Sequence, residues 1–247
     1  FHDLAQDAGG IRRLAVLRAD IDNLGQAFVS GFESEKHGQK YVTLSRTATF
    51  SRKLALFFKL HVNTLLQEGE YSLHVNDEAG PRKATIVYSG GDDVFIIGAW
   101  DDIIGFAVDL NDSLSDYAQG TLTISAGIGI YPEKYPVAAM ARQTGELEDA
   151  SKAYPGKNAV TLFDESGTYS WDEFINAVLA EKYELIRDFF QTMQDYGKSF
   201  LYRLLDLMRS RDEKINLARY AYLLARMEPA EEFVLVDGYN IIFAWDE

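Results

Sequence analysis

The 247-residue sequence contains no cysteine, which excludes disulfide bonds and thiolate metal sites. It also lacks any run of roughly 18 consecutive apolar residues, so we expect no membrane contact through a spanning helix. The chain begins with Phe1 and has no basic-then-apolar signal pattern, so we expect a segment of a longer protein. The absence of cysteine is typical of the reducing cytoplasm, where we expect the protein to act.

Positive charge is scarce, with 24 basic against 38 acidic residues and a net charge of −14. A protein this acidic does not bind nucleic acid through backbone electrostatics alone. Hydrophobic residues make up 47% of the chain, which is enough for a sizeable core and excludes intrinsic disorder. Residues 181–227 are near neutral, with 9 basic and 7 acidic groups, and form either a solvated helical surface or a face for a polyanion.

Apolar periodicity predicts two regions of different architecture. The first has the order strand, helix, helix, strand, strand, helix, strand, helix, strand, which is the ferredoxin-like pattern with one added helix. We therefore expect an α/β (α+β) domain with an antiparallel sheet over residues 1–167, a small all-helical domain over 168–230, and a tail over 231–247. The strands are expected at Leu14–Arg18, Ala84–Tyr88, Val94–Gly98, Thr121–Ile130 and Ala159–Phe163. The helices are expected near Leu24–Phe32, Thr43–Leu66, Ile103–Tyr117, Pro136–Ala153, Trp171–Lys182, Tyr183–Tyr196, Ser199–Met208 and Lys214–Met227.

The sequence Gly90-Gly91-Asp92-Asp93 separates two predicted strands and is expected to form the tip of a hairpin. The glycines allow a tight turn and close approach of a ligand. The adjacent acids repel each other unless a cation neutralises them, and Mg²⁺ prefers carboxylates, phosphates and water. Because Asp20 ends a strand expected beside this hairpin, Asp20, Asp92 and Asp93 are candidate catalytic and metal-binding residues. An ordinary surface turn is the alternative.

Two segments carry a family resemblance: Leu14–Phe28 (LAVLRADIDNLGQAF) and Tyr88–Asp102 (YSGGDDVFIIGAWDD). They closely resemble the large, polymerase-palm subunit of type III CRISPR complexes, the III-A form in particular, over roughly residues 10–165. That family shares its fold with GGDEF diguanylate cyclases. Its second palm uses two metal ions, Mg²⁺ or Mn²⁺, to join ATP into cyclic oligoadenylates when the complex binds target RNA.

The resemblance also implies partners and residue roles. The partners would be other subunits of the effector complex, with guide RNA and target RNA, and a second palm domain. Metal binding is implied for Asp20, Ile21, Asp92 and Asp93. Nucleotide contacts are expected at Ser89, Gly90 and Gly91, although Ser89 has a simple turn role as its alternative.

A second match lies downstream, where Ala150-Ser151-Lys152 is followed by Pro155-Gly156-Lys157-Asn158-Ala159-Val160. This resembles the cyclase signature Ala-Lys-x-x-Gly-Arg-Asn-Arg-Val, whose lysine contacts the triphosphate. Lys152 falls on that lysine and Lys157 on a basic position of the signature, which makes both candidate nucleotide-binding residues. The alternative for each is a solvated loop lysine.

Departures from the cyclase pattern bear on the choice of base. Cyclases carry Asp-x-Asp-x-Phe-Lys-x-x-Asn, whose Asn reads guanine, but Phe28 stands at the Asn position here. Phe28 either stacks on a purine or belongs to the core. Residues 82–85 also do not match the inhibitory Arg-x-x-Asp site of cyclases. ATP oligoadenylate synthesis is therefore the main hypothesis, and the alternatives are a diguanylate cyclase and a catalytically idle scaffold palm.

Three further features are weaker. The histidines show no metal-ligand spacing, and Asp101 and Asp102 are interpreted as acids that cap a helix. The tail segment Phe233–Trp245 resembles the first strand and turn of NYN-type, PIN-like ribonucleases, with Asp237 at their metal-binding position. A further strand packed on the helices is the alternative for this segment.

Overall fold

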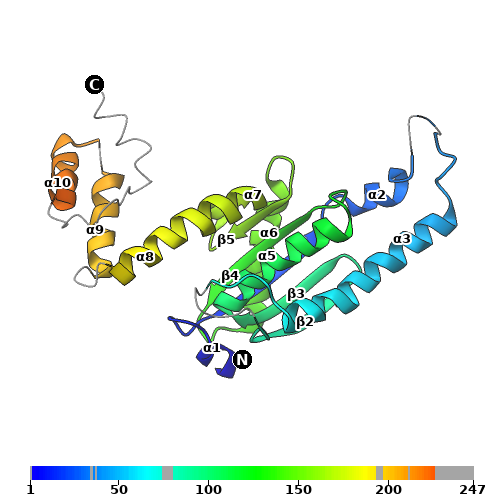
Figure 1. Cartoon of the computed structure of the whole chain (residues 1–247), viewed down its shortest axis with the longest axis horizontal. Helices are drawn as coiled ribbons and strands as arrows, with labels where there is room; N and C mark the ends of the chain where they lie inside the picture. The colour runs from blue at the N-terminus through cyan, green and yellow to red at the C-terminus, as the bar shows by residue number, and fades with distance from the viewer. Residues whose placement is uncertain are drawn as a thin grey trace. The chain divides into compact units, whose positions relative to one another are not determined.

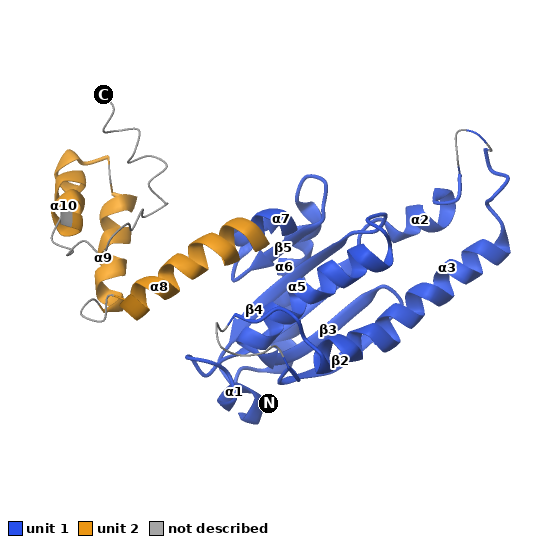
Figure 2. Cartoon of the chain, in the orientation of Figure 1, with its two compact units in different colours: residues 1–174 blue, residues 175–247 orange. Residues whose placement is uncertain are grey.

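The computed structural model describes residues 2–33, 36, 38–73, 80–192, 197–210 and 212–225. The chain divides into two compact units, residues 1–174 and 175–247 (Figure 2). The boundary that we predict from the sequence lies seven residues earlier, at 167. No helix of the described residues is long and apolar enough to cross a membrane. The ribonuclease-like tail, with Asp237, lies outside the described residues.

The first unit is built on a six-stranded sheet with the strand order β2-β3-β1-β4-β5-β6 (Figure 1). All neighbouring strands are antiparallel except β4 and β5, which are parallel. The expectation of a purely antiparallel sheet is therefore wrong at this one pair. A helix between two strands is the crossover that a parallel pair requires, and α6 provides it here. The strands are β1 Leu14–Ile21, β2 Ala84–Gly90, β3 Asp93–Ala99, β4 Ile124–Tyr131, β5 Ala159–Leu162 and β6 Thr168–Ser170.

Three short elements of the first unit are absent from the sequence-based prediction: strand β6, helix α1 and the 3₁₀ helix η2 (Glu165–Gly167). Strand β6 has three residues, too few for alternation to show, and it pairs with β5. Its last residue, Ser170, is also the N-cap of the helix that follows, because its hydroxyl accepts a hydrogen bond from the N–H of Glu173. Helix α1, His2–Gln6, has only five residues.

The longer helices of this unit agree with the predicted periodicity. Thr43 is the N-cap of a continuous helical stretch that runs from Leu44 to Gln67, close to the predicted range. Helices α2 and α3 extend away from the sheet side by side (Figure 1). The elements are α2 Leu24–Ser30, α3 Leu44–Leu56, η1 Phe57–His61, α4 Val62–Gln67, α5 Trp100–Tyr117, α6 Val137–Ala153, η2 Glu165–Gly167 and α7 Trp171–Glu173.

Strand β1 is the centre of the core. Its first four residues are fully buried, and side chains alternate between the two faces of a strand. Leu14 and Val16 pack with Ile97 of β3, Met140 of α6 and residues of α1, while α5 packs against β1, β3 and β4. Alternation places Asp20 on the same face as Val16, which is the face covered by α6.

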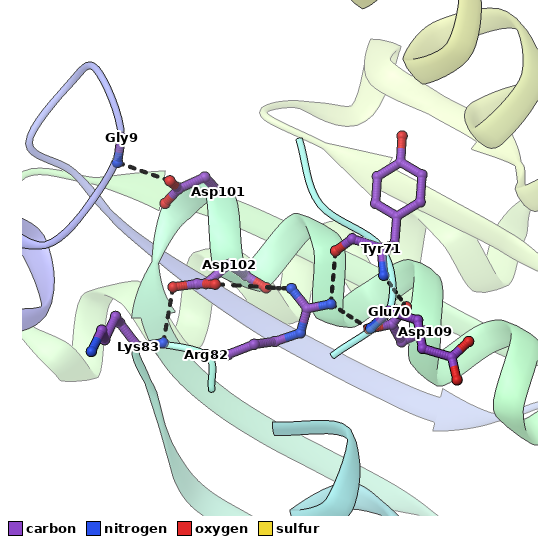
Figure 3. A network of polar contacts seen from close by, with 8 residues as sticks. All are labelled: Gly9, Glu70, Tyr71, Arg82, Lys83, Asp101, Asp102 and Asp109. Carbon is purple, nitrogen blue, oxygen red and sulfur yellow. Dashed lines mark hydrogen bonds and ion pairs between the residues drawn. The ribbon is translucent and has the colours of Figure 1, made fainter. Parts of the chain in front are cut away.

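A polar network ties the segment before β2 to helix α5 (Figure 3). The guanidinium of Arg82 is buried, forms an ion pair with Asp109, and donates to the carbonyl of Tyr71 at 2.8 Å. Asp109 also accepts hydrogen bonds from the backbone N–H groups of Glu70, at 3.1 Å, and Tyr71, at 2.9 Å. The N–H of Lys83 donates to Asp102 at 2.9 Å. These contacts fix the end of β2 that is remote from the hairpin tip.

The same network corrects the interpretation of Asp101 and Asp102 as capping residues. Both lie in the first turn of α5, but the N-cap is Ala99, which makes no side-chain cap. Asp101 accepts a hydrogen bond from the N–H of Gly9 at 2.8 Å instead. These acids therefore join α5 to other segments rather than satisfying its own backbone.

The second unit is helical, as predicted. The two helices expected to meet near residue 182 form one continuous stretch, because η3 (Phe174–Tyr183) leads directly into α8 (Glu184–Thr192). Helices α9 (Lys198–Arg209) and α10 (Lys214–Ala225) pack against each other.

Candidate functional site

The end of β1 and the turn between β2 and β3 meet at one edge of the sheet. Asp20 is the register partner of Asp93, and the N–H of Ile21 donates to the carbonyl of Asp92 at 3.1 Å. Gly91 has a φ of 75°, which residues with side chains rarely adopt, so glycine suits this turn. The fold thus brings together the backbones of the three aspartates that the sequence predicts as metal-binding residues. We call Asp20, Asp92 and Asp93 the carboxylate edge.

The charges of the carboxylate edge act on one another. Burial, and then the charges of Asp20 and Asp93, raise the pKa of Asp92 above its ordinary value. The charge of Asp93 is also the largest cause of the raised pKa of Tyr88, a neighbour on β2. Like charges held together in this way are stabilised by a cation.

Helix α6 brings a cation to the carboxylate edge. A Cβ atom at Gly127 of β4 would lie 2.4 Å from the backbone nitrogen of Glu148, so the close approach of this helix requires glycine. Glu148 and Lys152 are one helical turn apart and share a face. The Nζ atom of Lys152 lies 2.7 Å from an oxygen of Asp20 and 2.7 Å from an oxygen of Glu148.

Glu148 holds two cations although its side chain is only 7% exposed. Besides Lys152, it pairs with Arg18 of β1, whose Nε lies 3.1 Å from its second oxygen. Burial by itself lowers the pKa of Lys152, but hydrogen bonds to Asp20 and Glu148 outweigh it and leave the pKa raised. Lys152 is therefore charged at neutral pH.

Asp22, the second acid of Asp20-Ile21-Asp22, has a different position. It is buried, and its carboxylate accepts hydrogen bonds from the hydroxyls of Thr123, at 2.8 Å, and Ser125, at 2.7 Å. The backbone N–H of Asn158 donates to it at 3.0 Å. Both oxygens of Asp22 are thus engaged, so Asp22 joins β1, β4 and the loop before β5.

The second predicted lysine, Lys157, lies in that loop. Its Nζ donates to the side-chain oxygen of Asn23 at 2.8 Å. Lys157, Asn158 and Asn23 all have left-handed backbone conformations, with φ of 56°, 50° and 53°. Asparagine tolerates this conformation better than most residues, and the N–H of Asn158 is held by Asp22. Among the contacts described for the two lysines, only Lys152 pairs with the carboxylate edge.

Ser89 and Phe28 make internal contacts. The hydroxyl of Ser89 donates to the carbonyl of Phe58 at 2.9 Å. The ring of Phe28 packs edge-to-face on Phe50, with centroids 5.0 Å apart. The expected contact of Ser89 with a nucleotide, and of Phe28 with a purine, stay predictions.

Two hollows lie near helix α6. One has a volume of about 570 Å³ and an acidic lining that includes Glu146, Asp149 and Glu165, which would repel a triphosphate. The other, of about 200 Å³, includes Asp93 in its lining and therefore adjoins the carboxylate edge. Its charged lining residues are Arg18, Asp93 and Glu148, and the others are Ala19, Tyr88, Val94, Phe95 and Ala141.

The carboxylate edge fits a hard divalent cation in donor type, because carboxylate oxygens are its preferred protein ligands. In the part of the chain that the structure describes, however, no three acidic or histidine side chains are gathered closely enough to hold an ion as they stand. One oxygen of Asp20 is engaged by Lys152 instead. The backbone placement suits a metal site, and the side chains must rearrange to form it.

Three residues that take part in these contacts were not predicted from the sequence: Arg18, Asn23 and Glu148. Arg18 lies two residues before Asp20, and alternation places both on one face of β1. Glu148 precedes Lys152 by four residues on a helix, so that spacing signals the pair. The contact between Asn23 and Lys157 joins residues 134 positions apart, and no local pattern indicates it.

Comparison with protein families gives two matches. Residues 13–161 match the model described as Cas10/Cmr2, second palm domain. Residues 187–240 match the second helical domain of the CRISPR RNA silencing complex Cmr2 subunit. The second match includes residues 231–240, which belong to the segment that we set apart as a tail.

Individual relatives agree with these matches. CRISPR system single-strand-specific deoxyribonucleases Cas10/Csm1 (subtype III-A) are 51% identical in Mycobacterium tuberculosis, over 92% of this chain, and 46% identical in Streptococcus thermophilus, over 90%. The chain spans 28% of the length of each of these relatives.

Solved structures show the same fold. A Csm1-Csm4 cassette in complex with cA4 matches with a TM-score of 0.70 and 27% identity, over 92% of this chain and 33% of that one. A Csm1-Csm4 cassette in complex with one ATP matches with a TM-score of 0.69 and 28% identity, over 90% and 32%. These structures confirm the predicted α/β palm followed by a helical part. The chain belongs to the Cas10/Cmr2 family of type III CRISPR systems, and its relatives include Cas10/Csm1 proteins of subtype III-A.

Proposed function

We propose that this chain is the palm that joins ATP into oligoadenylates within a type III CRISPR effector complex. The observation that carries the proposal is the carboxylate edge with Lys152 beside it, at the end of a palm strand. Relatives of the same fold have been solved in complex with ATP and with cA4, which supports adenine nucleotides as the substrate class.

The reaction would be attack by the 3′-hydroxyl of one ATP on the α-phosphate of another. A bond forms between the attacking oxygen and phosphorus, the bond from that phosphorus to the bridging oxygen breaks, pyrophosphate leaves, and the hydroxyl proton passes to solvent. A pair of Mg²⁺ or Mn²⁺ ions, when bound by Asp20, Ile21, Asp92 and Asp93, would supply the charge that activates the hydroxyl and stabilises pyrophosphate.

The chain's own residues would bind and orient the nucleotide. Lys152, in the last turn of α6, pairs with the carboxylate edge, and Lys157 lies in the loop that follows this helix. Each offers a point charge suited to phosphate. Gly90 and Gly91 leave room for the triphosphate at the hairpin tip, with Ser89 adjoining them. Because little covalent chemistry falls to the protein, most of the rate enhancement would come from positioning and charge neutralisation.

Partners are needed for full activity. One palm holds a donor or an acceptor ATP, and the reaction requires both in line, which a second palm would provide. Holding two reactants together supplies about 7–11 kcal/mol of the barrier. The other partners would be further subunits of the complex, such as the Csm4 seen with relatives, together with guide RNA and target RNA, in the cytoplasm.

The alternatives have less support. A diguanylate cyclase would need its guanine-reading Asn, where this chain has Phe28. The deoxyribonuclease activity in the relatives' names is not proposed for this chain, because the matched domains are a palm and a helical domain. An idle scaffold palm is the hypothesis that the next experiment separates from ours.

The test is incubation with radiolabelled ATP or GTP and Mg²⁺ or Mn²⁺, using the chain alone over a range of concentrations and the assembled complex with target RNA. We expect oligoadenylates from the complex, and slow, concentration-dependent turnover by the chain alone. A complex that makes no oligoadenylate with either metal would contradict the proposal. Equal turnover per chain at all concentrations would show that one palm suffices.

A further inference from the structure

Lys152 pairs with two carboxylates, Asp20 and Glu148, whose side chains differ in solvent exposure. Asp20 belongs to the carboxylate edge and has a side chain 23% exposed, whereas the Glu148 side chain is 7% exposed. Lys152 makes a contact of 2.7 Å with each. The Asp20 carboxylate, which the proposed function assigns to a metal ion, is therefore already paired with the ammonium group of Lys152.

We propose that Lys152 is the built-in counter-ion of Asp20 in the metal-free protein, and that it must leave Asp20 before a metal ion binds there. The triphosphate of the nucleotide then receives the lysine. The metal ion binds Asp20 and the triphosphate binds Lys152. Binding of either ligand therefore breaks the ion pair and frees the residue that the other ligand needs. This inference rests on the proposed function.

The surroundings of Lys152 allow this exchange. Glu148 stays neutralised when Lys152 moves, because Arg18 remains at 3.1 Å from its other oxygen. Arg18 is itself fixed by a hydrogen bond of 3.4 Å from its Nη1 to the carbonyl of Ala141. The lysine side chain is 30% exposed, and its four-carbon stem is flexible. The ammonium group can therefore turn from Asp20 towards solvent or phosphate while its neighbours keep their contacts.

The exchange accounts for the arrangement of the carboxylate edge. In the described parts of the chain the acidic side chains do not form a ready metal cage, although the register of β1 and β3 places Asp20 beside Asp93. Burial is the largest cause of the raised pKa of Asp92 and the charge of Asp20 is the next, so the ion pair between Lys152 and Asp20 neutralises part of the repulsion that adds to burial. Metal binding without nucleotide is consequently weakened, since the ion must compete with a lysine.

The coupling between the two ligands is reciprocal by thermodynamic necessity. If Lys152 only bound phosphate, replacing it would weaken nucleotide binding and leave metal binding without nucleotide unchanged. If it is the counter-ion of Asp20, replacing it strengthens metal binding without nucleotide. Lys157 provides the matched control, because its ammonium group contacts the amide oxygen of Asn23 rather than a carboxylate.

The experiment measures Mn²⁺ binding to the 247-residue chain by electron paramagnetic resonance, first without nucleotide. We expect Lys152→Met to bind Mn²⁺ roughly fivefold to tenfold more tightly than the wild type, at the lower end of typical coupling between sites, and Lys157→Met to bind it unchanged. Repeating the titration with AMPPNP, we expect the nucleotide to improve Mn²⁺ affinity less in Lys152→Met than in the wild type. Thermal unfolding checks each variant, and Lys152→Gln replaces the Met variant if that one folds poorly.

The outcomes separate the inference from the proposed function. Mn²⁺ affinity without nucleotide that is unchanged or weaker in the folded Lys152 variant overturns the counter-ion role. Equal strengthening in Lys157→Met also overturns it, because the effect would then reflect only the loss of one positive charge. A wild-type chain that binds no Mn²⁺ even with AMPPNP contradicts the metal site of the proposed function instead.

Discussion

Asp109 and Asp92 belong to the same palm but differ in what neutralises their charge. Asp109 lies on α5, is buried, and is paired with Arg82 and two backbone N–H groups (Figure 3). Asp92 lies at the hairpin tip and is half-buried, and burial, followed by the charges of Asp20 and Asp93, raises its pKa. The first carboxylate is neutralised by an ion pair within the protein, and we propose that a bound cation neutralises the second.

The difference shows how burial separates a structural carboxylate from a candidate functional one. A buried charge is tolerated when it is paired and hydrogen-bonded, and removing its partner is costly. A half-exposed cluster of like charges costs less to maintain but is stabilised when a cation arrives. Substitutions in the two clusters should therefore have opposite effects on activity and stability.

The largest expected effect is on activity at the carboxylate edge. Asp92→Ala with Asp93→Ala should lower oligoadenylate production by the assembled complex by at least about 10³-fold, because charge stabilisation of this kind is worth that much per group. The free energy of unfolding should not fall, since the change removes repulsion. Product yield by chromatography and thermal unfolding of the same samples measure both. Unchanged yield would contradict the assignment of these residues.

The opposite pattern is expected at the buried cluster. Arg82→Met should lower the free energy of unfolding by about 3–5 kcal/mol, because it leaves Asp109 buried without its cation. The control is Arg82→Met combined with Asp109→Leu, which removes both charges and should recover much of the loss. Urea unfolding of the three proteins tests this. A destabilisation that the double variant does not reduce would show that packing, rather than charge, dominates there.

A smaller effect concerns the choice of base. We expect ATP to bind more tightly than GTP, because Phe28 offers no polar group to guanine and unpaired buried polar groups cost about 1–3 kcal/mol. Calorimetry with non-hydrolysable analogues of both nucleotides measures the ratio. Phe28→Asn should reduce the preference if the ring lies near the base, and tighter GTP binding to the wild type would count against adenine selectivity.

The smallest effect is the pH dependence of stability. An acid whose folded-state pKa is raised destabilises the fold once it ionises, so Asp92 should contribute most stability at low pH and lose it as the pH rises through its raised pKa. Asp92→Asn should therefore raise the Tm slightly at pH 7, by about 1–2 °C, since half-exposed charges are worth well under 1 kcal/mol. This gain should vanish near pH 3, where the wild-type carboxyl is protonated. A gain that persists at low pH would point to a cause other than charge.

Local patterns were sufficient to predict most of the first unit. The apolar run at Leu14–Arg18 and the two-glycine turn at Gly90 specify β1 and the hairpin, and their family resemblance indicates the palm that the solved relatives confirm. Strand β6 was not predicted, because a strand of three residues is too short to show an alternating pattern of apolar residues. The parallel pairing of β4 and β5 was missed, although the helix predicted between them is the crossover that such a pair requires.

The three acids of the carboxylate edge and the two lysines were predictable as residues, but Glu148, Arg18 and the contacts between them were not. Asp20, Asp92 and Asp93 stand at predicted strand ends, where their residue type is conspicuous. Lys152 was expected to touch phosphate, and its ion pair with Asp20 depends on the spacing between α6 and β1, which is a tertiary property. The metal and nucleotide roles of all these residues stay predictions until they are measured.

The glycine at position 127 has a consequence for how this palm tolerates sequence change. Even one methyl group there would meet the backbone of α6 at 2.4 Å, so the helix would have to move outward. Lys152 lies on α6 and Asp20 on the sheet, so the distance between their charged groups would increase if the helix moved outward. Gly127→Ala would thus weaken an ion pair that it does not touch. The distance between α6 and the sheet therefore determines how well Lys152 neutralises Asp20.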